Sequence, residues 1–257
     1  GFQRLAILDR SERGRQPFSS ADGSIVLMLN GEIYNALDHR RVLERDGYAF
    51  HSETDTEVLL ALYERDGLER MLEQLNGMFA LAMADTREGV VHLIRDPLGV
   101  KPLYWAQCGQ SVLFASEAKA FLAHPEFRAE IDPEQLDELL AFRYVTGART
   151  PLKGVHHVLP GHRMTVGAGG ISHARYWSIP DPAAAPMTFS AAVERLDEQL
   201  RQSVCLQMRS DVAVGCQLSG GIDSSLVTAY AAACASQRIA TCSVVFDEVM
   251  FSEKEWI

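Results

Sequence analysis

The residues whose types and spacing could do chemistry lie in one stretch, Q-L-S-G-G-I-D-S-S, at 217–225. Two adjacent glycines let the backbone approach a ligand without interference from a Cβ atom. A helix after them would point free N–H groups at the loop, and Ser219, Ser224 and Ser225 could add hydroxyl donors to phosphate oxygens. Asp223 would repel phosphate unless it holds Mg²⁺, a hard cation that binds carboxylate and phosphate oxygens together. The stretch therefore predicts a site for nucleotide phosphates and magnesium.

The loop differs from a Walker A loop, because the chain contains no G-x-x-x-x-G-K-[ST] and no lysine follows the glycines. S-G-G-I-D-S instead resembles the pyrophosphate loop of the ATP pyrophosphatase (PP-loop) enzymes. The resemblance implies that ATP is split between its α and β phosphates and that a substrate oxygen is adenylated. An ordinary turn between a strand and a helix is the alternative, and the six-residue match outweighs it.

These residues need a strand before the loop and a helix after it. An apolar run predicts a strand at 212–218, an alanine-rich pattern predicts a helix at 224–237, and a second strand is expected at 239–246. Strand, helix and strand with a right-handed crossover predict a parallel α/β sheet. An amphipathic stripe at Val193, Leu196, Leu200 and Val204 predicts a helix upstream. One such unit buries too little surface to stand alone, so we expect the sequence to be truncated at both ends.

The earlier part of the chain predicts strands and helices in blocks, which indicates α+β layers. Strands are expected at 1–9, 25–29, 75–84, 90–94, 112–115 and 164–166, and helices at 36–46, after 51–56, at 116–122 and at 132–144. Asn30-Gly31 ends a strand, and this pair is the commonest hairpin signal, so a type I′ turn is the local prediction. A proline- and alanine-rich stretch predicts a linker at 179–188 between domains at 1–178 and 189–257.

Composition excludes several classes of protein. The 257 residues carry a net charge of −10, which disfavours tight nonspecific binding to nucleic acid. No apolar run approaches the roughly 20 residues that a membrane helix needs. The five cysteines are odd in number and form no C-x-x-C, so reduced thiols in the cytosol are expected and a zinc site is not. The pair His156-His157 has no third ligand at metal spacing, which favours a loop pair over a metal site.

Eight fragments together resemble an asparagine-synthetase-type glutamine-dependent amidotransferase, in that family's order and over almost the whole chain. They are R-L-A-I-L-D at 4–9, N-G-E-I-Y-N at 30–35, S-E-T-D-T-E-V at 52–58, G-M-F-A at 77–80, R-D-P-L-G-V-K-P-L-Y at 95–104, F-A-S-E-A-K-A at 114–120, L-P-G-H at 159–162 and L-S-G-G-I-D-S-S at 218–225. The resemblance implies a class II glutaminase domain of the N-terminal-nucleophile fold, a four-layer αββα sandwich. The start of an α/β parallel-sheet PP-loop ATP pyrophosphatase domain would follow, and ammonia would pass inside the protein between the two.

The resemblance also assigns the glutamine site. Arg4 would pair with the α-carboxylate through its planar guanidinium. Asn30 and Gly31 would form the oxyanion hole, where each donor typically contributes about 3 kcal/mol. Glu32 and Asp55 would bind the α-ammonium group, although the residues around Asp55 alone favour a plain helix N-cap.

For ATP, the resemblance places Leu218 and Val244 beside the adenine. The residues that would surround the pyrophosphate are Ser219, Gly220, Gly221, Asp223 and Ser224, with Asp223 on Mg²⁺. One departure concerns the nucleophile, which in this family is a cysteine at the mature N-terminus activated by its own α-amine. Here residue 1 is glycine and the first cysteine is Cys108, so the chain as written is not expected to hydrolyse glutamine.

The implied reaction converts aspartate, ATP and glutamine into asparagine, AMP, pyrophosphate and glutamate. The resemblance also implies a cytoplasmic protein that could form a homodimer. One alternative is a related amidotransferase or cyclase that adenylates a different carboxylic acid in natural-product or cell-surface biosynthesis. Another is a non-catalytic scaffold that keeps the fold. The acceptor acid stays open, because the residues that would bind it lie beyond Ile257.

Overall fold

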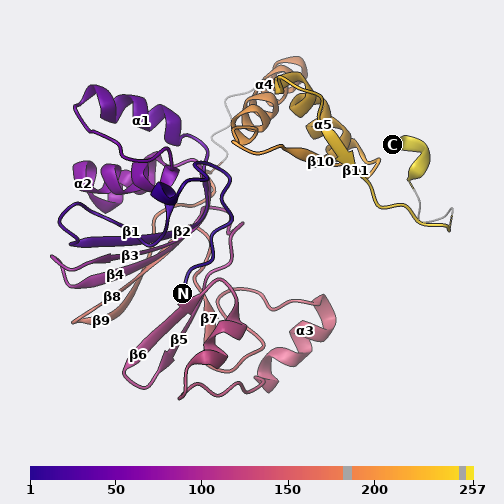
Figure 1. Cartoon of the computed structure of the whole chain (residues 1–257). Coiled ribbons are helices and arrows are strands. Elements are labelled where there is room, and N and C mark those ends of the chain that lie inside the picture. Colours follow the sequence, from indigo (N-terminus) through magenta and orange to yellow (C-terminus); the bar gives the residue numbers. More distant parts are fainter. Residues whose placement is uncertain (182–186, 249–252) are drawn as a thin grey trace. The chain divides into compact units, whose positions relative to one another are not determined.

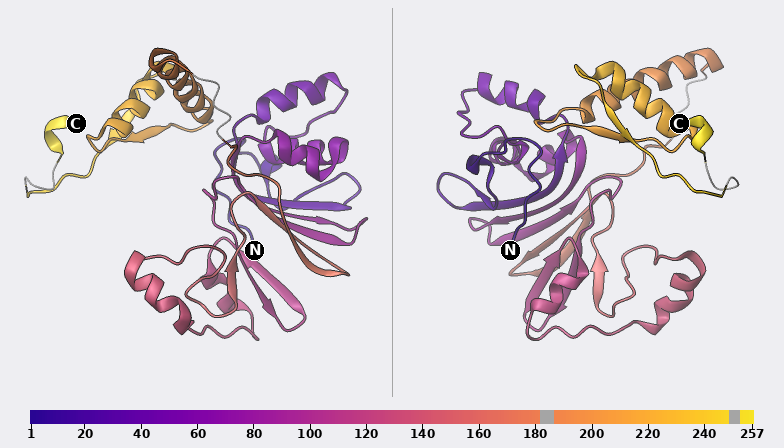
Figure 2. Two further views of the ribbon diagram at one scale, coloured as in Figure 1. Left: turned by 180° about the vertical axis from the view of Figure 1, so that it is seen from behind. Right: turned by 45° about the vertical axis from the view of Figure 1, so that its right-hand side comes forward.

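The computed structural model describes residues 1–181, 187–248 and 253–257, which form two compact units (Figures 1 and 2). Unit 1 contains Gly1–Leu5 and Ser11–Ile179, and unit 2 contains Ala6–Arg10 and Pro180–Ile257. The short segment Ala6–Arg10 therefore belongs to a different unit from its neighbours on both sides. The linker expected at 179–188 falls partly outside the described residues, at 182–186, and the domain limits 1–178 and 189–257 stay predictions.

A six-stranded antiparallel sheet is the centre of unit 1, with the order β1-β2-β3-β4-β8-β9. Its strands are β1 (Phe18–Ser19), β2 (Ile25–Ile33), β3 (Gly77–Asp85), β4 (Val90–Arg95), β8 (His162–Gly167) and β9 (Gly170–Arg175). The strand expected at 75–84 is confirmed as β3, which is buried from Phe79 to Met83. The strand expected at 90–94 is β4, and it pairs with β3 in an antiparallel hairpin.

Both faces of this sheet are covered, which produces the expected layers. Helices α1 (Ala36–Arg45) and α2 (Asp55–Gln74) cover one face (Figure 1), where alternate residues of β2 such as Leu27 and Leu29 join the largest core. On the other face, Ala82 and Leu93 pack with Trp105 of a second, three-stranded sheet and with Leu103 just before it. That sheet has the order β6-β5-β7, from β5 (Tyr104–Cys108), β6 (Ser111–Ala115) and β7 (Val155–His157).

The outer layer of the second sheet is built from a 3-10 helix. The helix η2 (Ala118–Ala123) places Phe121 against Ala106 and Val155, where the sequence predicted an ordinary helix at 116–122. The helix expected at 132–144 is divided into η3 (Pro133–Gln135) and α3 (Leu136–Phe142), and α3 has no buried residue. The αββα sandwich is thus confirmed as the fold class, with a thin fourth layer.

Two local predictions in unit 1 are wrong. The first strand of the described residues begins at Phe18, after the short 3-10 helix η1 (Glu12–Gly14), so no strand forms at 1–9. Asn30 and Gly31 form no hairpin turn, because β2 continues through them to Ile33 and pairs with β3 over nine residues. The long apolar run of β3 supplies a partner for every residue of β2, and this pairing outweighs the local turn preference of Asn-Gly.

Unit 2 contains the expected strand, loop, helix and strand. Parallel strands β10 (Gly215–Gln217) and β11 (Ala240–Cys242) flank α5 (Ile222–Cys234), α4 (Phe189–Gln207) precedes them, and η5 (Lys254–Trp256) follows. A disulfide joins Cys205 of α4 to Cys234 of α5, so the expectation of five reduced thiols is wrong for this pair. Cys108, Cys216 and Cys242 are free thiols.

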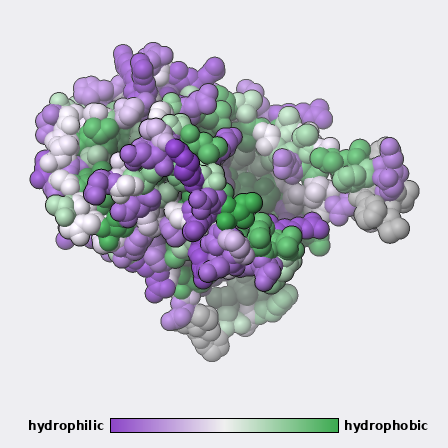
Figure 3. All heavy atoms as spheres, turned by 90° about the horizontal axis from the view of Figure 1, so that it is seen from below, coloured by the Kyte–Doolittle hydropathy of each residue, from purple (hydrophilic) through white to green (hydrophobic). Residues whose placement is uncertain are grey.

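The helices and one face of the surface bear on what the composition predicts about membranes. None of the helices in the described part of the chain combines the length and the apolar character needed to cross a membrane. On the face drawn in Figure 3, hydrophilic residues are interspersed with apolar ones.

Candidate functional site

The end of β2 carries three of the residues expected to act on glutamine. Gly31 lies opposite Phe79 of β3, and a Cβ atom at this position would lie 2.0 Å from the carbonyl oxygen of Met78. No side chain fits such a close approach, so the residue must be glycine. Glu32 follows it and is 9% exposed. The strand therefore places a main-chain N–H group and a buried carboxylate next to each other.

Asn30 contacts a residue that the sequence analysis did not select. Its side-chain amide donates to the hydroxyl of Ser116 at 3.0 Å, between β6 and η2. The oriented donor is therefore held by a residue from the second sheet. The signal was present in the fragment F-A-S-E-A-K-A, but a single serine in it has no feature that marks a functional role.

Asp55 joins the start of α2 to the end of β2. Its carboxylate accepts the backbone N–H of Ile33 at 2.9 Å, and the side chain is buried. Desolvation by burial raises the pKa of this carboxyl, against the hydrogen bonds and the charge of Arg4 that lower it. The helix N-cap is Thr54, whose hydroxyl accepts the N–H of Glu57, so the alternative of a plain N-cap at Asp55 is wrong.

Arg4 lies beside the same helix end. A Cβ atom on Gly14 would lie 2.5 Å from a guanidinium nitrogen of Arg4 and 2.6 Å from the methyl carbon of Thr54, so glycine leaves the space in which these two side chains meet. The positive charge of Arg4 also lowers the pKa of Asp55. The structure thus places Arg4 beside Asp55 and ties Asp55 to the strand that carries Asn30, Gly31 and Glu32.

The rest of the S-E-T-D-T-E fragment holds this helix start in place. Glu57 is 1% exposed and accepts the N–H groups of His51 and Ser52 at 2.8 and 2.7 Å, together with the Ser52 hydroxyl at 2.6 Å. A buried carboxylate that accepts three hydrogen bonds holds the loop in one conformation. Glu57 therefore positions Asp55, a role that the sequence analysis did not predict.

Asp96 holds a second loop in place, that of the R-D-P-L-G-V-K fragment. Its buried carboxylate accepts four backbone N–H groups, from Phe79, Leu98, Val100 and Lys101, at 2.9 to 3.2 Å. Phe79 is the residue opposite Gly31, so the loop is attached directly behind the expected oxyanion hole. Burial, followed by the charges of Glu32 and Asp96, raises the pKa of Tyr34, which puts both carboxylates close to this phenol.

In unit 2, the glycine loop is closed by its own serines. The Ser224 hydroxyl accepts the N–H of Ser219 at 3.1 Å and lies 2.9 Å from the Ser219 hydroxyl, which in turn accepts the N–H of Gly221 at 3.3 Å. Gly220 has φ +95°, and a Cβ atom there would lie 2.8 Å from Cβ of Glu253. Gly221 is the N-cap of α5 and has no side chain to cap the first N–H groups, which leaves the helix end open to an anion.

The remaining residues expected at ATP lie around this loop. Leu218 donates its N–H to Cys242 of β11 at 2.9 Å, and Asp223 is exposed in the first turn of α5. Val244 lies two residues beyond β11 and is 75% exposed, and no hydrogen bond among the described residues joins it to the loop. The loop residues are thus brought together, whereas Val244 is not tied to them.

Two family profiles match the chain. Residues 1–177 match the glutamine amidotransferase domain, and residues 195–257 match asparagine synthase. Asparagine synthetases 3 and 1 of Bacillus subtilis are each 37% identical to the chain, over 90% and 98% of it and over 38% and 39% of their own length. A protein named amidase chyE from Penicillium rubens is 33% identical over 90% of the chain and 34% of its own length. The chain therefore spans about two fifths of the length of these relatives.

Among solved structures, the glutamine phosphoribosylpyrophosphate amidotransferase of Bacillus subtilis aligns with a TM-score of 0.47 and 19% identity, over 89% of this chain and 48% of its own. The match to the first family profile extends over more than half of the chain and contains Arg4, Asn30, Gly31, Glu32 and Asp55. The chain accordingly belongs to the glutamine amidotransferase family, and is of the asparagine-synthetase type.

Proposed function

We propose that the protein takes part in glutamine-dependent, AMP-forming amide synthesis, with aspartate as the acceptor acid. The observation that carries the proposal is the grouping of Arg4, Asp55 and the end of β2 at Asn30–Glu32, in a chain that also holds a serine–glycine loop at a helix N-terminus. The first group matches the chemistry of an amino acid amide, and the loop matches that of a nucleotide phosphate.

In the glutamine site, groups of different charge bind different parts of the substrate. Arg4 pairs with the substrate carboxylate in bidentate fashion, while Glu32 and Asp55 pair with the ammonium group. The raised pKa of Asp55 supports this role, because a desolvated carboxylate gains more from a substrate cation than one in water does. Asn30 and the Gly31 N–H stabilise the negative oxygen that develops when the amide carbon is attacked.

The nucleophilic thiol is assigned to none of the five cysteines in this chain. Cys108 is the single cysteine of unit 1, and it is buried against His124 at the end of β5. The residues described here would therefore bind glutamine, orient it and stabilise charge.

The loop of unit 2 fits a nucleotide phosphate with Mg²⁺. Gly220 supplies a positive φ of +95° at the turn, the serine hydroxyls already converge, and the uncapped end of α5 offers N–H donors. Asp223, a hard oxygen ligand in the first turn, would hold the cation. The metal would neutralise the pyrophosphate that leaves, and Leu218 and Val244 would border the adenine.

The finer assignments rest on the relatives and on the chemistry of the substrates. Aspartate is proposed because the Bacillus relatives bear the name asparagine synthetase, while the relative named amidase chyE favours tests with other acids as well. We place the reaction in the cytoplasm, where ATP and free amino acids are abundant. The homodimer stays a prediction that light scattering after gel filtration would test.

The deciding experiment supplies the whole protein with glutamine, aspartate, ATP and Mg²⁺ and follows all products by chromatography. The proposal predicts asparagine, glutamate, AMP and pyrophosphate in equal amounts. ADP and phosphate as products would contradict the assignment of the loop. Release of AMP with a different acid, and none with aspartate, would support AMP-forming amide synthesis but show that the acceptor is not aspartate.

A further inference from the structure

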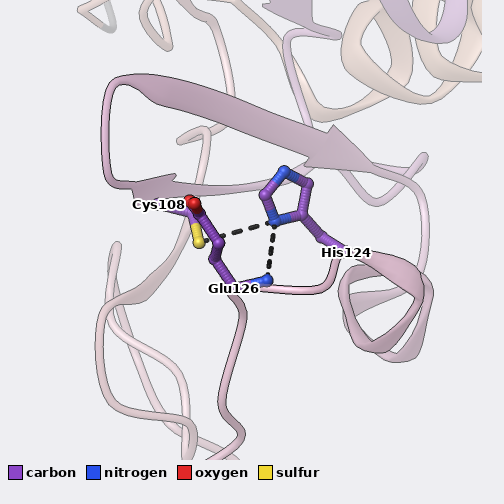
Figure 4. A group of neighbouring side chains, drawn as sticks. All are labelled: Cys108, His124 and Glu126. Atoms are coloured by element: carbon purple, nitrogen blue, oxygen red, sulfur yellow. Dashed lines mark hydrogen bonds between the residues drawn. The ribbon is translucent and has the colours of Figure 1, made fainter.

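Three side chains of different chemistry converge at the outer end of the second sheet, away from the residues assigned above. They are the Cys108 thiol at the end of β5 and the side chains of His124 and Glu126, which follow η2 (Figure 4). One ligand atom from each lies within 4.8 Å of those of the other two. Cys108 is buried, His124 is half-buried and Glu126 is exposed.

The arrangement is unlike that of a catalytic triad. A triad needs the thiol on one ring nitrogen of histidine and the acid on the other. Here Sγ of Cys108 lies 3.7 Å from Nδ1 of His124, and the same Nδ1 accepts the backbone N–H of Glu126 at 3.4 Å. Both contacts use Nδ1, and among the described residues no hydrogen bond joins the Glu126 carboxylate to Nε2, so the triad order is absent.

That N–H donor also selects the ring tautomer. Because Nδ1 accepts a hydrogen bond, the proton of the neutral ring is on Nε2. The lone pair of Nδ1 then lies between the Glu126 N–H and the Cys108 sulfur, and a cation bound to it would replace the 3.4 Å hydrogen bond. The cation would take the place of the thiol proton between Nδ1 and this sulfur.

The segment that carries His124 and Glu126 is fixed by contacts of its own. His124 donates its N–H to the Phe121 carbonyl, and the N–H of Phe127 donates to the His124 carbonyl. The rings of Phe121 and Phe127 meet at 5.6 Å and pack on the second sheet. Arg128 donates to the carbonyls of Pro125 and Phe127 at 2.7 and 2.9 Å. The positions of His124 and Glu126 are thus set by backbone hydrogen bonds and ring packing that do not involve the ligand side chains.

The spacing of the three groups suits zinc. With Zn–S of about 2.3 Å and Zn–N of about 2.05 Å, a tetrahedral site separates sulfur and nitrogen by about 3.5 Å, against 3.7 Å here. The Glu126 carboxylate needs a shift of about 1 Å to reach a similar separation, and its exposure leaves the side chain free to rotate. One thiolate and one carboxylate also neutralise a divalent cation, so no net charge stays at the buried end.

We propose that Cys108, His124 and Glu126 form a zinc site that joins the end of β5 to the segment after η2, with solvent as the fourth ligand. Thiolate and imidazole together select zinc over magnesium or calcium, which prefer oxygen ligands. The C-x-x-C rule applied to the sequence missed this site, because its ligands come from separate elements and are 16 and 2 residues apart.

Zinc uptake by the purified protein tests the site. The protein is loaded with Zn²⁺, dialysed against metal-free buffer and analysed by mass spectrometry, and its affinity is measured by competition with a chromophoric chelator. We expect one zinc per chain in the parent. Cys108→Ser and His124→Asn are expected to bind zinc at least tenfold more weakly, and Glu126→Gln more weakly by a smaller factor.

Matched controls separate these ligands from other thiols and imidazoles. Cys242→Ser and His162→Asn change a cysteine and a histidine outside the cluster and are expected to keep the parent affinity. Co²⁺ should give a thiolate-to-cobalt charge-transfer band in the parent that Cys108→Ser lacks. If Cys108→Ser does not fold, the zinc affinity of Glu126→Gln still tests the site, because Glu126 is exposed. Equal zinc uptake by the parent and all three ligand variants, or none by the parent, would overturn the proposal, and neither result depends on glutamine or ATP turnover.

Discussion

The side-chain amide of Asn30 donates a hydrogen bond to the Ser116 hydroxyl at 3.0 Å, across 86 residues of sequence. This bond connects the end of β2 in the first sheet to the segment after β6 in the second. Because the amide is already held, little reorganisation is needed when a negative oxygen forms beside it.

Asn30→Ala in the whole protein should lower glutamine-dependent kcat by roughly 10²–10³, as loss of one oxyanion donor does elsewhere. Synthesis from free ammonia should be retained, because it bypasses the glutaminase site. Steady-state assays with each nitrogen source measure both values. Ser116→Ala should cost less than about tenfold, since it removes only the orienting partner. Equal loss of glutamine- and ammonia-dependent activity in Asn30→Ala would show that the residue is structural.

Gly31→Ala should lower the free energy of unfolding by about 3 kcal/mol, since its Cβ atom would meet the Met78 carbonyl oxygen at 2.0 Å. Gly23→Ala is the control, because Gly23 also has a positive φ, +70°, but nothing lies within 4 Å of the added atom. It should cost only about 1 kcal/mol, from backbone strain alone. Urea unfolding compares the two. Similar decreases in the free energy of unfolding for the two variants would mean that β3 moves easily to accommodate the added Cβ atom.

Asp55→Asn should raise the thermal midpoint of the unliganded protein while it weakens glutamine binding. The folded pKa of Asp55 is raised, chiefly by burial, so its ionised form costs stability at neutral pH, and the neutral amide removes that cost. Glu57→Gln is the contrasting variant and should lower the midpoint, because three donors lose a charged acceptor. Scanning calorimetry with and without glutamine tests the pair. A lower midpoint for Asp55→Asn would contradict the burial argument.

Asp223→Asn should reduce ATP-dependent synthesis at least about tenfold and raise the Mg²⁺ concentration needed for half-maximal rate. Glutamine hydrolysis should change less, since Asp223 belongs to unit 2. Exchange of labelled pyrophosphate into ATP measures the effect. An unchanged Mg²⁺ requirement would show that Asp223 does not bind the metal.

Acid should destabilise unit 1 through His92. Burial lowers the pKa of His92 below its ordinary 6.5, so the unfolded chain takes up a proton that the folded one resists. Stability is therefore fully present above pH 6.5 and decreases as the pH falls below it.

His92→Gln, whose side chain can still form a hydrogen bond with Thr165, should lose less stability than the parent as the pH falls below 6.5. His156 and His157 have the same sign of shift and will leave some dependence, which urea titrations at several pH values would quantify. An identical slope in both proteins would contradict the role of His92.

The sequence predicted the elements whose patterns are long and regular. The helix beginning near Asp55 was found because its apolar residues recur at helical spacing, and the run at 75–84 because it is almost continuously apolar. The hairpin at Asn30-Gly31 was wrong, since two residues cannot reveal that a nine-residue partner strand lies alongside. Asp96 and Ser116 were missed for a related reason. Asn30, the partner of Ser116, lies 86 residues away, and the contact that joins Asp96 to β3 is with Phe79, 17 residues away, so no local spacing reports these two contacts.

The segment Ala6–Arg10 has a consequence for dissecting the protein into fragments. Asp9 donates its N–H to the Asp211 carboxylate at 2.8 Å, and the N–H of Asp211 donates to the Ile7 carbonyl. A gene cut between residues 179 and 180 would give the second fragment all of its helices but none of these five residues. Such a cut would therefore remove both backbone partners of Asp211, so a fragment meant to keep these contacts needs Ala6–Arg10 as well.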